Sequence, residues 1–132
     1  MDIKVKFFED SFVEAIGPGI YGIYFQTNTE NKELLYVGES VFVLVRCATH
    51  LYEIVKGDGY LGFTKEIIER NNITLAFELL LSESDKKRRK AKEKEIIKGR
   101  HPKMQSEISD RVKSIEDMIK EMTNLLNNTA PI

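Results

Sequence analysis

Two short apolar runs near the N-terminus, residues 19–25 and 34–38, are rich in β-branched and aromatic side chains. The stretch between them, residues 27–31, is polar and has the composition of a turn. The two runs therefore predict a β-hairpin, and the nearly continuous apolar run at residues 73–81 predicts a third strand. Residues 2–8 alternate only weakly and are the candidate for an extra edge strand.

Helical spacing of apolar residues covers much of the remaining chain. It predicts helices over residues 41–56, 64–70 and 82–98. In the third of these, Ser82 and Asp85 form a capping box at the N-terminus. Together the elements predict an α+β fold, in which a small three-stranded antiparallel β-sheet is flanked by helices.

The C-terminal part of the chain has a different, heptad-like pattern. Its apolar residues alternate spacings of four and three: Ile108, Val112, Ile115, Ile119, Met122 and Leu126, widened by Met118 and Leu125. We expect residues 1–105 to form the main domain and residues 106–132 an added amphipathic helix. That helix either packs back on its own sheet or joins two copies of the chain in a homodimer.

Composition is that of one globular domain, with 132 residues of which 42% are hydrophobic and 31% charged. No run of about 18 uncharged apolar residues occurs, so no membrane span is expected. The single cysteine, Cys47, cannot form an internal disulfide, and no signal-peptide pattern is present. These features favour a reducing cytoplasm.

The net charge of −1 conceals a steep asymmetry. Residues 86–103 carry ten lysines and arginines against two glutamates, a local net of +8, so the other 114 residues sum to −9. Such a division favours a basic surface that meets a polyanion. The alternative for a charge run is an ordinary solvated helix face.

The predicted hairpin carries two short tyrosine motifs. Gly19-Ile20-Tyr21 lies in the first run, and Tyr36-Val37-Gly38 ends the second. A hairpin places the two tyrosines on neighbouring strands, and the strand register decides whether they share a face.

Four later residues complete a longer pattern: Arg46, His50, Glu93 and Gln105. With them, the chain resembles the GIY-YIG nuclease superfamily over residues 16–105, most of its length. Members of that superfamily cut nucleic acid in DNA repair, restriction and intron homing. The resemblance implies a metal-dependent DNA endonuclease.

The resemblance also implies roles for the first four side chains. Tyr21 would act as general base or position the attacking water, which requires a lowered phenol pKa. Tyr36 would hydrogen-bond the nucleophile or a phosphate oxygen. Arg46 would clamp the phosphate, because its planar guanidinium stabilises charge that develops on the phosphate oxygens. His50 lies one helical turn beyond Arg46 on the same face, and would accept a proton from Tyr21 or contact a phosphate.

Glu93 stands out on the helical wheel. It lies between Ile96 and Ile97 on the strip that must face the core, whereas Glu95 projects to almost the opposite side. A carboxylate on an apolar strip is costly to desolvate unless a cation neutralises it. The candidates are a divalent metal, Arg46 or a neighbouring lysine, and the simplest alternative is an i,i+4 pair with Arg89.

In the family, the glutamate that corresponds to Glu93 is the lone protein ligand of one Mg²⁺ or Mn²⁺. Mg²⁺ suits so sparse a site because it retains several waters and takes further ligands from phosphate oxygens. Gln105 departs from the family pattern, which usually has asparagine in a Pro-x-x-Asn setting. It retains the amide with one more methylene.

The basic run supplies the residues that we expect to contact DNA: Lys86, Lys87, Arg88, Arg89, Lys90, Arg100 and Lys103.

Core packing of the tyrosines, with their hydroxyl groups at a wet edge, is the competing interpretation of Tyr21 and Tyr36. Arg46 can likewise be the polar rim of a helix. The corresponding alternative function is a non-catalytic nucleic-acid-binding or assembly module that retains the fold.

Overall fold

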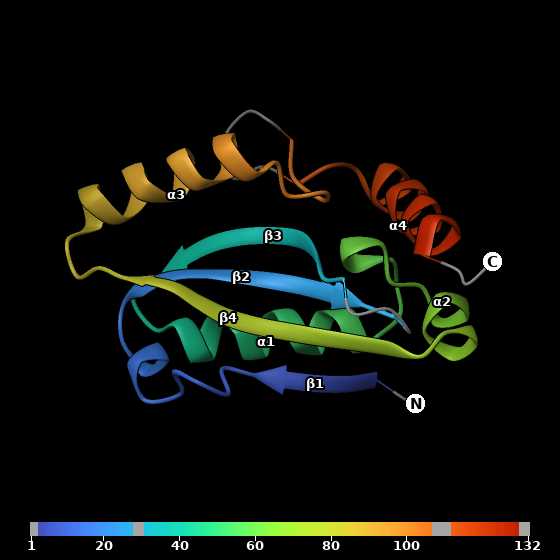
Figure 1. Ribbon diagram of the computed structural model, residues 1–132, viewed down its shortest axis with the longest axis horizontal. Coiled ribbons are helices and arrows are strands. Elements are labelled where there is room, and N and C mark those ends of the chain that lie inside the picture. The colour runs from blue at the N-terminus through green and yellow to red at the C-terminus, as the bar shows by residue number, and fades with distance from the viewer. Residues whose placement is uncertain (1–2, 28–30, 107–111, 130–132) are drawn as a thin grey trace.

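The computed structural model describes residues 3–27, 31–106 and 112–129 of the chain. Within these residues it has one four-stranded sheet with the order β1-β4-β2-β3 (Figure 1). The strands are β1 (Ile3–Phe7), β2 (Gly19–Gln26), β3 (Glu33–Ser40) and β4 (Ile73–Ser82). β2 is antiparallel to both of its neighbours, whereas β1 is parallel to β4.

The predicted α+β class is therefore confirmed, but the sheet of three antiparallel strands was wrong in detail. Ile3–Phe7, within the weakly alternating stretch, form a fourth strand, and its parallel pairing makes the sheet mixed. β4 is nearly continuously apolar because β2 and β1 pair with it on both sides, and a helix covers one of its faces.

The hairpin register places the two motif tyrosines on one face of the sheet. Tyr21 lies opposite Gly38, and Ile23 lies opposite Tyr36. Opposed residues share a face, as do residues two apart along a strand, so Tyr21 and Tyr36 point the same way. Residues 28–30 of the predicted turn lie outside the described residues.

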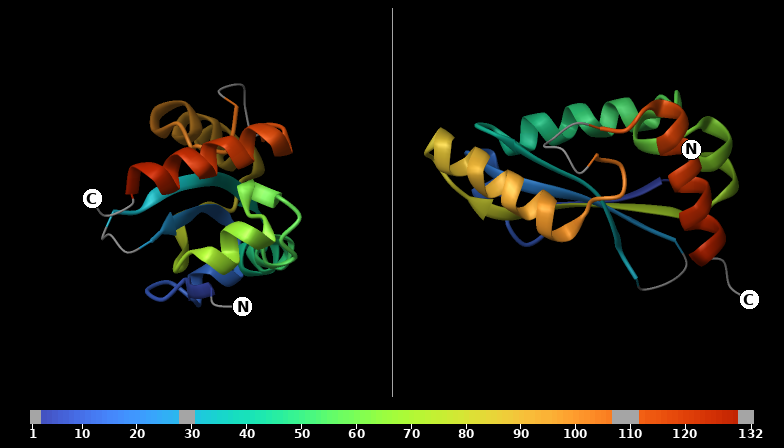
Figure 2. Two further views of the ribbon diagram at one scale, coloured as in Figure 1. Left: turned by 90° about the vertical axis from the view of Figure 1, so that its right-hand side faces the viewer. Right: turned by 90° about the horizontal axis from the view of Figure 1, so that it is seen from above.

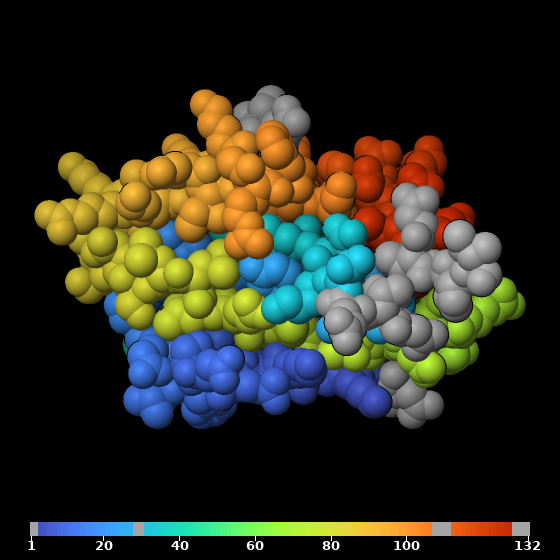
Figure 3. Space-filling view, in the orientation of Figure 1, coloured from blue at the N-terminus to red at the C-terminus, as the bar shows by residue number. Residues whose placement is uncertain are grey.

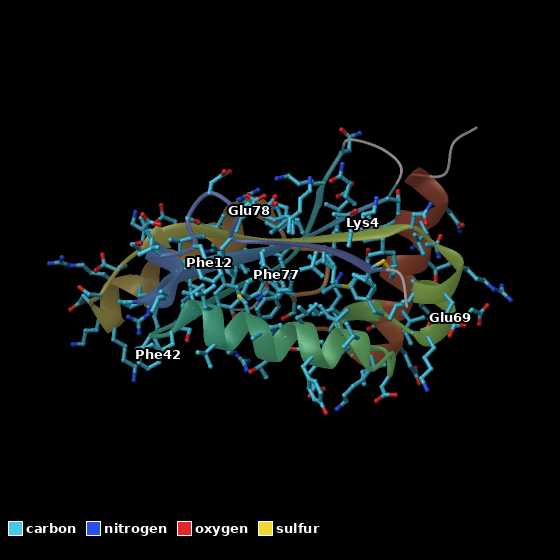
Figure 4. The ribbon with its side chains drawn as sticks, turned by 90° about the horizontal axis from the view of Figure 1, so that it is seen from below. Lys4, Phe12, Phe42, Glu69, Phe77 and Glu78 are labelled. Atoms are coloured by element: carbon cyan, nitrogen blue, oxygen red, sulfur yellow. The ribbon has the colours of Figure 1, made fainter. Side chains whose placement is uncertain are left out.

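Helices cover the two faces of the sheet unequally. α1 (Val43–Val55) packs against one face, and α3 (Lys86–Arg100) lies along β3 on the other, as the right panel of Figure 2 shows. The larger core lies between the sheet and α1, and Figure 4 shows Phe77 there, with Glu78 on the opposite side of the sheet. A smaller cluster of Ile20, Val37 and Ile97 lies beneath α3.

α3 begins later than the sequence predicted. Ser82 still belongs to β4, so it cannot form the expected capping box. Asp85 is the N-cap instead, and its side chain accepts a hydrogen bond from the backbone N–H of Arg88 at 2.9 Å. The shift follows from the sheet, because pairing with Gly19 extends β4 to Ser82.

The C-terminal helix α4 (Ile115–Thr129) packs back on its own chain. Its neighbour is the 3-10 turn η2 (Tyr60–Gly62), just before the short helix α2 (Lys65–Arg70). The buried residues of α4 are Met118, Met122 and Leu125, whereas Val112 and Ile115 are exposed. The predicted seam is therefore rotated, and Ile108 lies outside the described residues.

No helix among the described residues is long and apolar enough to cross a membrane.

Candidate active site

Tyr21, Tyr36 and His50 meet between the hairpin and α1. The Tyr21 hydroxyl lies 2.8 Å from Nε2 of His50. The ring centroid of His50 is 4.9 Å from that of Tyr36 and 5.6 Å from that of Tyr21. All three side chains are buried, and Tyr21 is only 1% exposed. The structure thus brings together three residues that lie up to 29 positions apart in the sequence.

Gly38 makes this packing possible. A Cβ atom at position 38 would clash with the hydroxyl of Tyr21 and would come within 2.8 Å of the Tyr36 ring. The glycine of the second motif therefore provides space for the phenol that lies across the hairpin. This reason involves close packing and does not depend on an unusual backbone angle.

Arg46 lies at the rim of the cluster. The residue is exposed, and its guanidinium is close enough to the Tyr21 hydroxyl to lower the pKa of that phenol. A guanidinium can only donate, so a Tyr21 oxygen that faces Arg46 as an acceptor and directs its own proton to Nε2 of His50 suits both neighbours. We therefore assign His50 the tautomer that carries its proton on Nδ1.

Tyr60 completes the cluster, and the sequence analysis did not select it. Its hydroxyl lies 2.7 Å from Nδ1 of His50, on the side of the ring away from Tyr21. Tyr60 belongs to η2, and its only sequence signal is a position ten residues after His50, behind the loop Gly57-Asp58-Gly59. Any other loop tyrosine would give the same signal, so the sequence does not single out Tyr60.

Burial dominates the electrostatics of the cluster. It raises the pKa of Tyr21 above its usual value, and Arg46 offsets only part of this effect. Burial, followed by the nearby charge of Arg46, lowers the pKa of His50 to about 4. At neutral pH, Tyr21 is therefore a neutral phenol and His50 a neutral imidazole. The lowered phenol pKa that a resting general base requires is not present.

Glu93 lies on the α3 side of the sheet. It is buried at 5% exposure, between Arg89 and Ile97 on the face that α3 turns toward β3. The tyrosine cluster faces α1, on the other side of the same strand. The alternative partner Arg89 instead pairs with Glu39, at 3.3 Å between Nε and Oε2.

Arg89 is not exposed in the way that the predicted contact with DNA requires. It is 2% exposed, and its guanidinium also donates to the carbonyl oxygens of Glu83 and Ser84. It therefore holds the start of α3 against the end of β3. Figure 3 shows α3 on the surface of the molecule. The other residues that were predicted to contact DNA are exposed: Lys86, Lys87, Arg88, Lys90 and Arg100 of α3, and Lys103 beyond it.

Gln105 binds the backbone of β3 with both ends of its amide. Its Oε1 accepts from the N–H of Val37 at 2.8 Å, and its Nε2 donates to the Val37 carbonyl at 2.7 Å. The preceding residues add hydrogen bonds from Lys103 to Leu34 and from Met104 to Leu35. Residues 103–105 thus cover the outer edge of β3 as far as Val37. The side-chain amide of Gln105 therefore holds the backbone of β3, a role that the sequence did not predict.

The donor set fits only a weakly coordinated metal. Among the described residues, no group of three or more histidine, cysteine, aspartate or glutamate side chains is placed to hold a metal ion. A single carboxylate such as Glu93 does not suffice for zinc, which takes three or four protein ligands. It does suit Mg²⁺, whose remaining ligands would be waters and phosphate oxygens.

Comparisons of the chain with protein-family models, curated proteins and solved structures gave no significant match. The resemblance to the GIY-YIG superfamily therefore stays a prediction from the sequence.

Proposed function

We propose that the protein is a metal-dependent DNA endonuclease that hydrolyses phosphodiester bonds at the Tyr21 cluster. One observation carries the proposal: a buried Tyr21–His50 hydrogen bond lies behind an exposed arginine. An arginine at the surface can receive a phosphate, and the buried pair behind it can relay a proton.

In the proposed reaction, water attacks phosphorus in line with the leaving oxygen. The new P–O bond forms as the P–O bond to the leaving oxygen breaks, and the leaving oxygen takes a proton from solvent. The attacking water gives its proton to Tyr21 while Tyr21 passes its own proton to Nε2 of His50. Arg46 stabilises the charge that develops on the phosphate oxygens, and Tyr36 orients the water or a phosphate oxygen.

Access to Tyr21 depends on Arg46. The phenol is almost fully buried, and the guanidinium lies beside its hydroxyl. A phosphate that binds Arg46 would draw the guanidinium outward. Substrate binding would thereby open the Tyr21 hydroxyl to the attacking water.

Glu93 is the proposed protein ligand of Mg²⁺ or Mn²⁺. When bound, the metal would supply positive charge to phosphate oxygens in the transition state. Glu93 contributes one carboxylate on the α3 side of β3, and the substrate would supply the phosphate oxygens. This assignment depends on the resemblance and on the burial of Glu93.

The DNA backbone would cross the edge of β3. The cluster lies on the α1 side of this strand and the basic side chains of α3 on the other side. Residues 103–105 cover the edge from Leu34 to Val37, and Gly38 lies beyond the last of these hydrogen bonds. The last part of β3, from Gly38 to Ser40, is therefore the proposed crossing point.

A non-catalytic nucleic-acid-binding module is the second candidate. The raised pKa of Tyr21 favours it, since the free protein shows no activated base. Under this alternative, the basic face of α3 binds the backbone, and the buried cluster is an ordinary hydrogen-bonded core.

Incubation with supercoiled, linear and branched DNA in Mg²⁺ or Mn²⁺ separates the two functions. We expect the wild type to cleave, and we expect cleavage to be lost in Glu93→Ala. Glu95→Ala is the matched control, because Glu95 lies on the same helix with a side chain that is 71% exposed. Equal behaviour of wild type and Glu93→Ala over a range of metals would show the hydrolytic mechanism to be wrong.

Homodimerisation through the C-terminal helix stays a prediction. The apolar residues of α4 that pack on η2 are used within the chain, and Val112 and Ile115 are the exposed members of the predicted seam. Sedimentation of a truncated chain ending at Ser106 tests it, and a mass per particle equal to one chain with or without α4 would reject the dimer.

A further inference from the structure

Tyr60 ends a line of hydrogen bonds that runs from the rim of the candidate site back toward the surface. Arg46 lies beside the Tyr21 hydroxyl, which is 2.8 Å from Nε2 of His50, and Nδ1 of His50 is 2.7 Å from the Tyr60 hydroxyl. With the tautomer assigned above, Tyr21 donates to Nε2 and Nδ1 donates to the Tyr60 oxygen. Tyr60 itself is half-buried, so this residue lies between the buried histidine and solvent.

Neither of the two inner groups can hold an extra charge. Burial raises the pKa of Tyr21, which disfavours the phenolate. The pKa of His50, about 4, leaves roughly one imidazolium in a thousand molecules at pH 7. A proton that arrives at Tyr21 must therefore pass through His50 in the same event and leave on its far side.

We propose that Tyr60 is the proton exit of the active site and the residue that sets the tautomer of His50. The inference deepens the proposed hydrolysis and depends on it. One proton enters from the attacking water at the Tyr21 oxygen, and the proton of Tyr21 moves to Nε2. The Nδ1 proton moves to the Tyr60 oxygen, and the original Tyr60 proton leaves to solvent. Every group ends in its starting protonation state after the chain reorients.

Other polar groups around the chain leave this direction unchanged. The groups that shift the pKa values of the hydrogen-bonded side chains are Tyr36 from β3, Arg46, Cys47 and Glu53 from α1, and Tyr60 from η2. Arg46 disfavours a charged His50 from the entry side. It also acts on Tyr60, where Glu53 opposes it, so the direction of proton movement is set by the order of the hydrogen bonds.

The C-terminal helix holds Tyr60 in place. The turn around it has three residues with positive φ, namely Gly59 at 98°, Leu61 at 51° and Gly62 at 86°. A Cβ atom at position 62 would lie 2.5 Å from the Met118 carbonyl oxygen, and one at position 59 would lie 2.8 Å from the Ile115 side chain. α4 therefore packs directly on the backbone at both sides of Tyr60. This contact fixes a turn that a free loop would not retain.

Tyr60→Phe tests the proposal in the full chain, because it removes one hydroxyl and leaves the ring. Tyr52→Phe is the matched control, since Tyr52 lies on α1 and is 63% exposed. With Mg²⁺ and plasmid DNA, we expect kcat of Tyr60→Phe to fall about 10- to 100-fold with KM nearly unchanged. The deficit should shrink as pH rises, because hydroxide can take the proton in place of Tyr60.

Nitrogen NMR of the His50 ring supplies a readout that does not require cleavage. In the wild type we expect a protonated Nδ1 and an unprotonated Nε2. In Tyr60→Phe the proton should move to Nε2, which then donates to the Tyr21 oxygen, whereas Tyr52→Phe should match the wild type. An unchanged tautomer together with an unchanged kcat and pH profile overturns the proton exit while leaving the nuclease intact. Absence of cleavage by the wild type instead overturns the proposed function and the exit with it.

Discussion

Replacing Gln105 with leucine separates a structural amide from a catalytic one. Gln105 is 4% exposed, and it satisfies both the N–H and the carbonyl of Val37. Leucine is an apolar side chain of similar bulk and leaves two buried backbone groups without these partners. Each such group costs about 1–3 kcal/mol, so we expect Gln105→Leu to lose about 2–6 kcal/mol of unfolding free energy.

Urea unfolding followed by far-ultraviolet circular dichroism measures this loss. With an m value of about 2 kcal/mol/M, the midpoint should fall by about 1–3 M while the slope stays the same. Asn72→Leu is the control, because it removes an amide from an exposed position. It should change the free energy by no more than about 0.5 kcal/mol.

A Gln105→Glu substitution adds a test with a definite pH sign. One oxygen of the introduced carboxylate still accepts from the Val37 N–H, but the other faces the Val37 carbonyl. Its pKa in the folded state is therefore raised, so the variant is less destabilised below the ordinary glutamate pKa and loses stability as pH rises.

If Gln105→Leu unfolds like the wild type yet loses DNA cleavage, the amide acts on substrate and our structural account is wrong.

Three further predictions concern other parts of the molecule. His50 has a pKa of about 4 when folded, against an ordinary 6.5, so the unfolded chain binds more protons between these values. About 3 kcal/mol of stability, present above pH 6.5, should be lost as pH falls toward 4, and urea titrations of His50→Asn should lack this component. Arg89→Met should cost about 3–5 kcal/mol in urea unfolding, because Glu39 loses its buried partner. Adding Glu39→Gln should recover most of that loss, whereas the exposed Arg88→Met should change stability little. If the basic face of α3 neutralises about five phosphates, the slope of log affinity against log salt should be roughly −4 to −5. A flat salt response in a fluorescence anisotropy titration would exclude this face as the binding surface.

Local patterns determined the elements of this protein. The two apolar runs rich in β-branched and aromatic residues, with the turn chemistry between them, suffice for the hairpin, and Thr64 caps α2 where its side chain accepts from Ile67 N–H. The burial of Glu93 was also readable, because its position on the apolar strip of one helix follows from spacing alone. Such features depend on residues a few positions apart, which is the range over which sequence periodicity operates.

Tertiary packing decided the rest. Three contacts join segments that no local spacing predicts to be neighbours. They are the parallel pairing of β1, the hydrogen bond of Tyr60 with His50 and the hydrogen bonds of Gln105 with Val37. Arg89 shows the same limit, because in the sequence it is one more basic residue of the run. Only the structure shows that it pairs with Glu39. The reason is physical: spacing along the chain says which side of an element a residue occupies. Which residue lies opposite depends on how whole elements dock against one another.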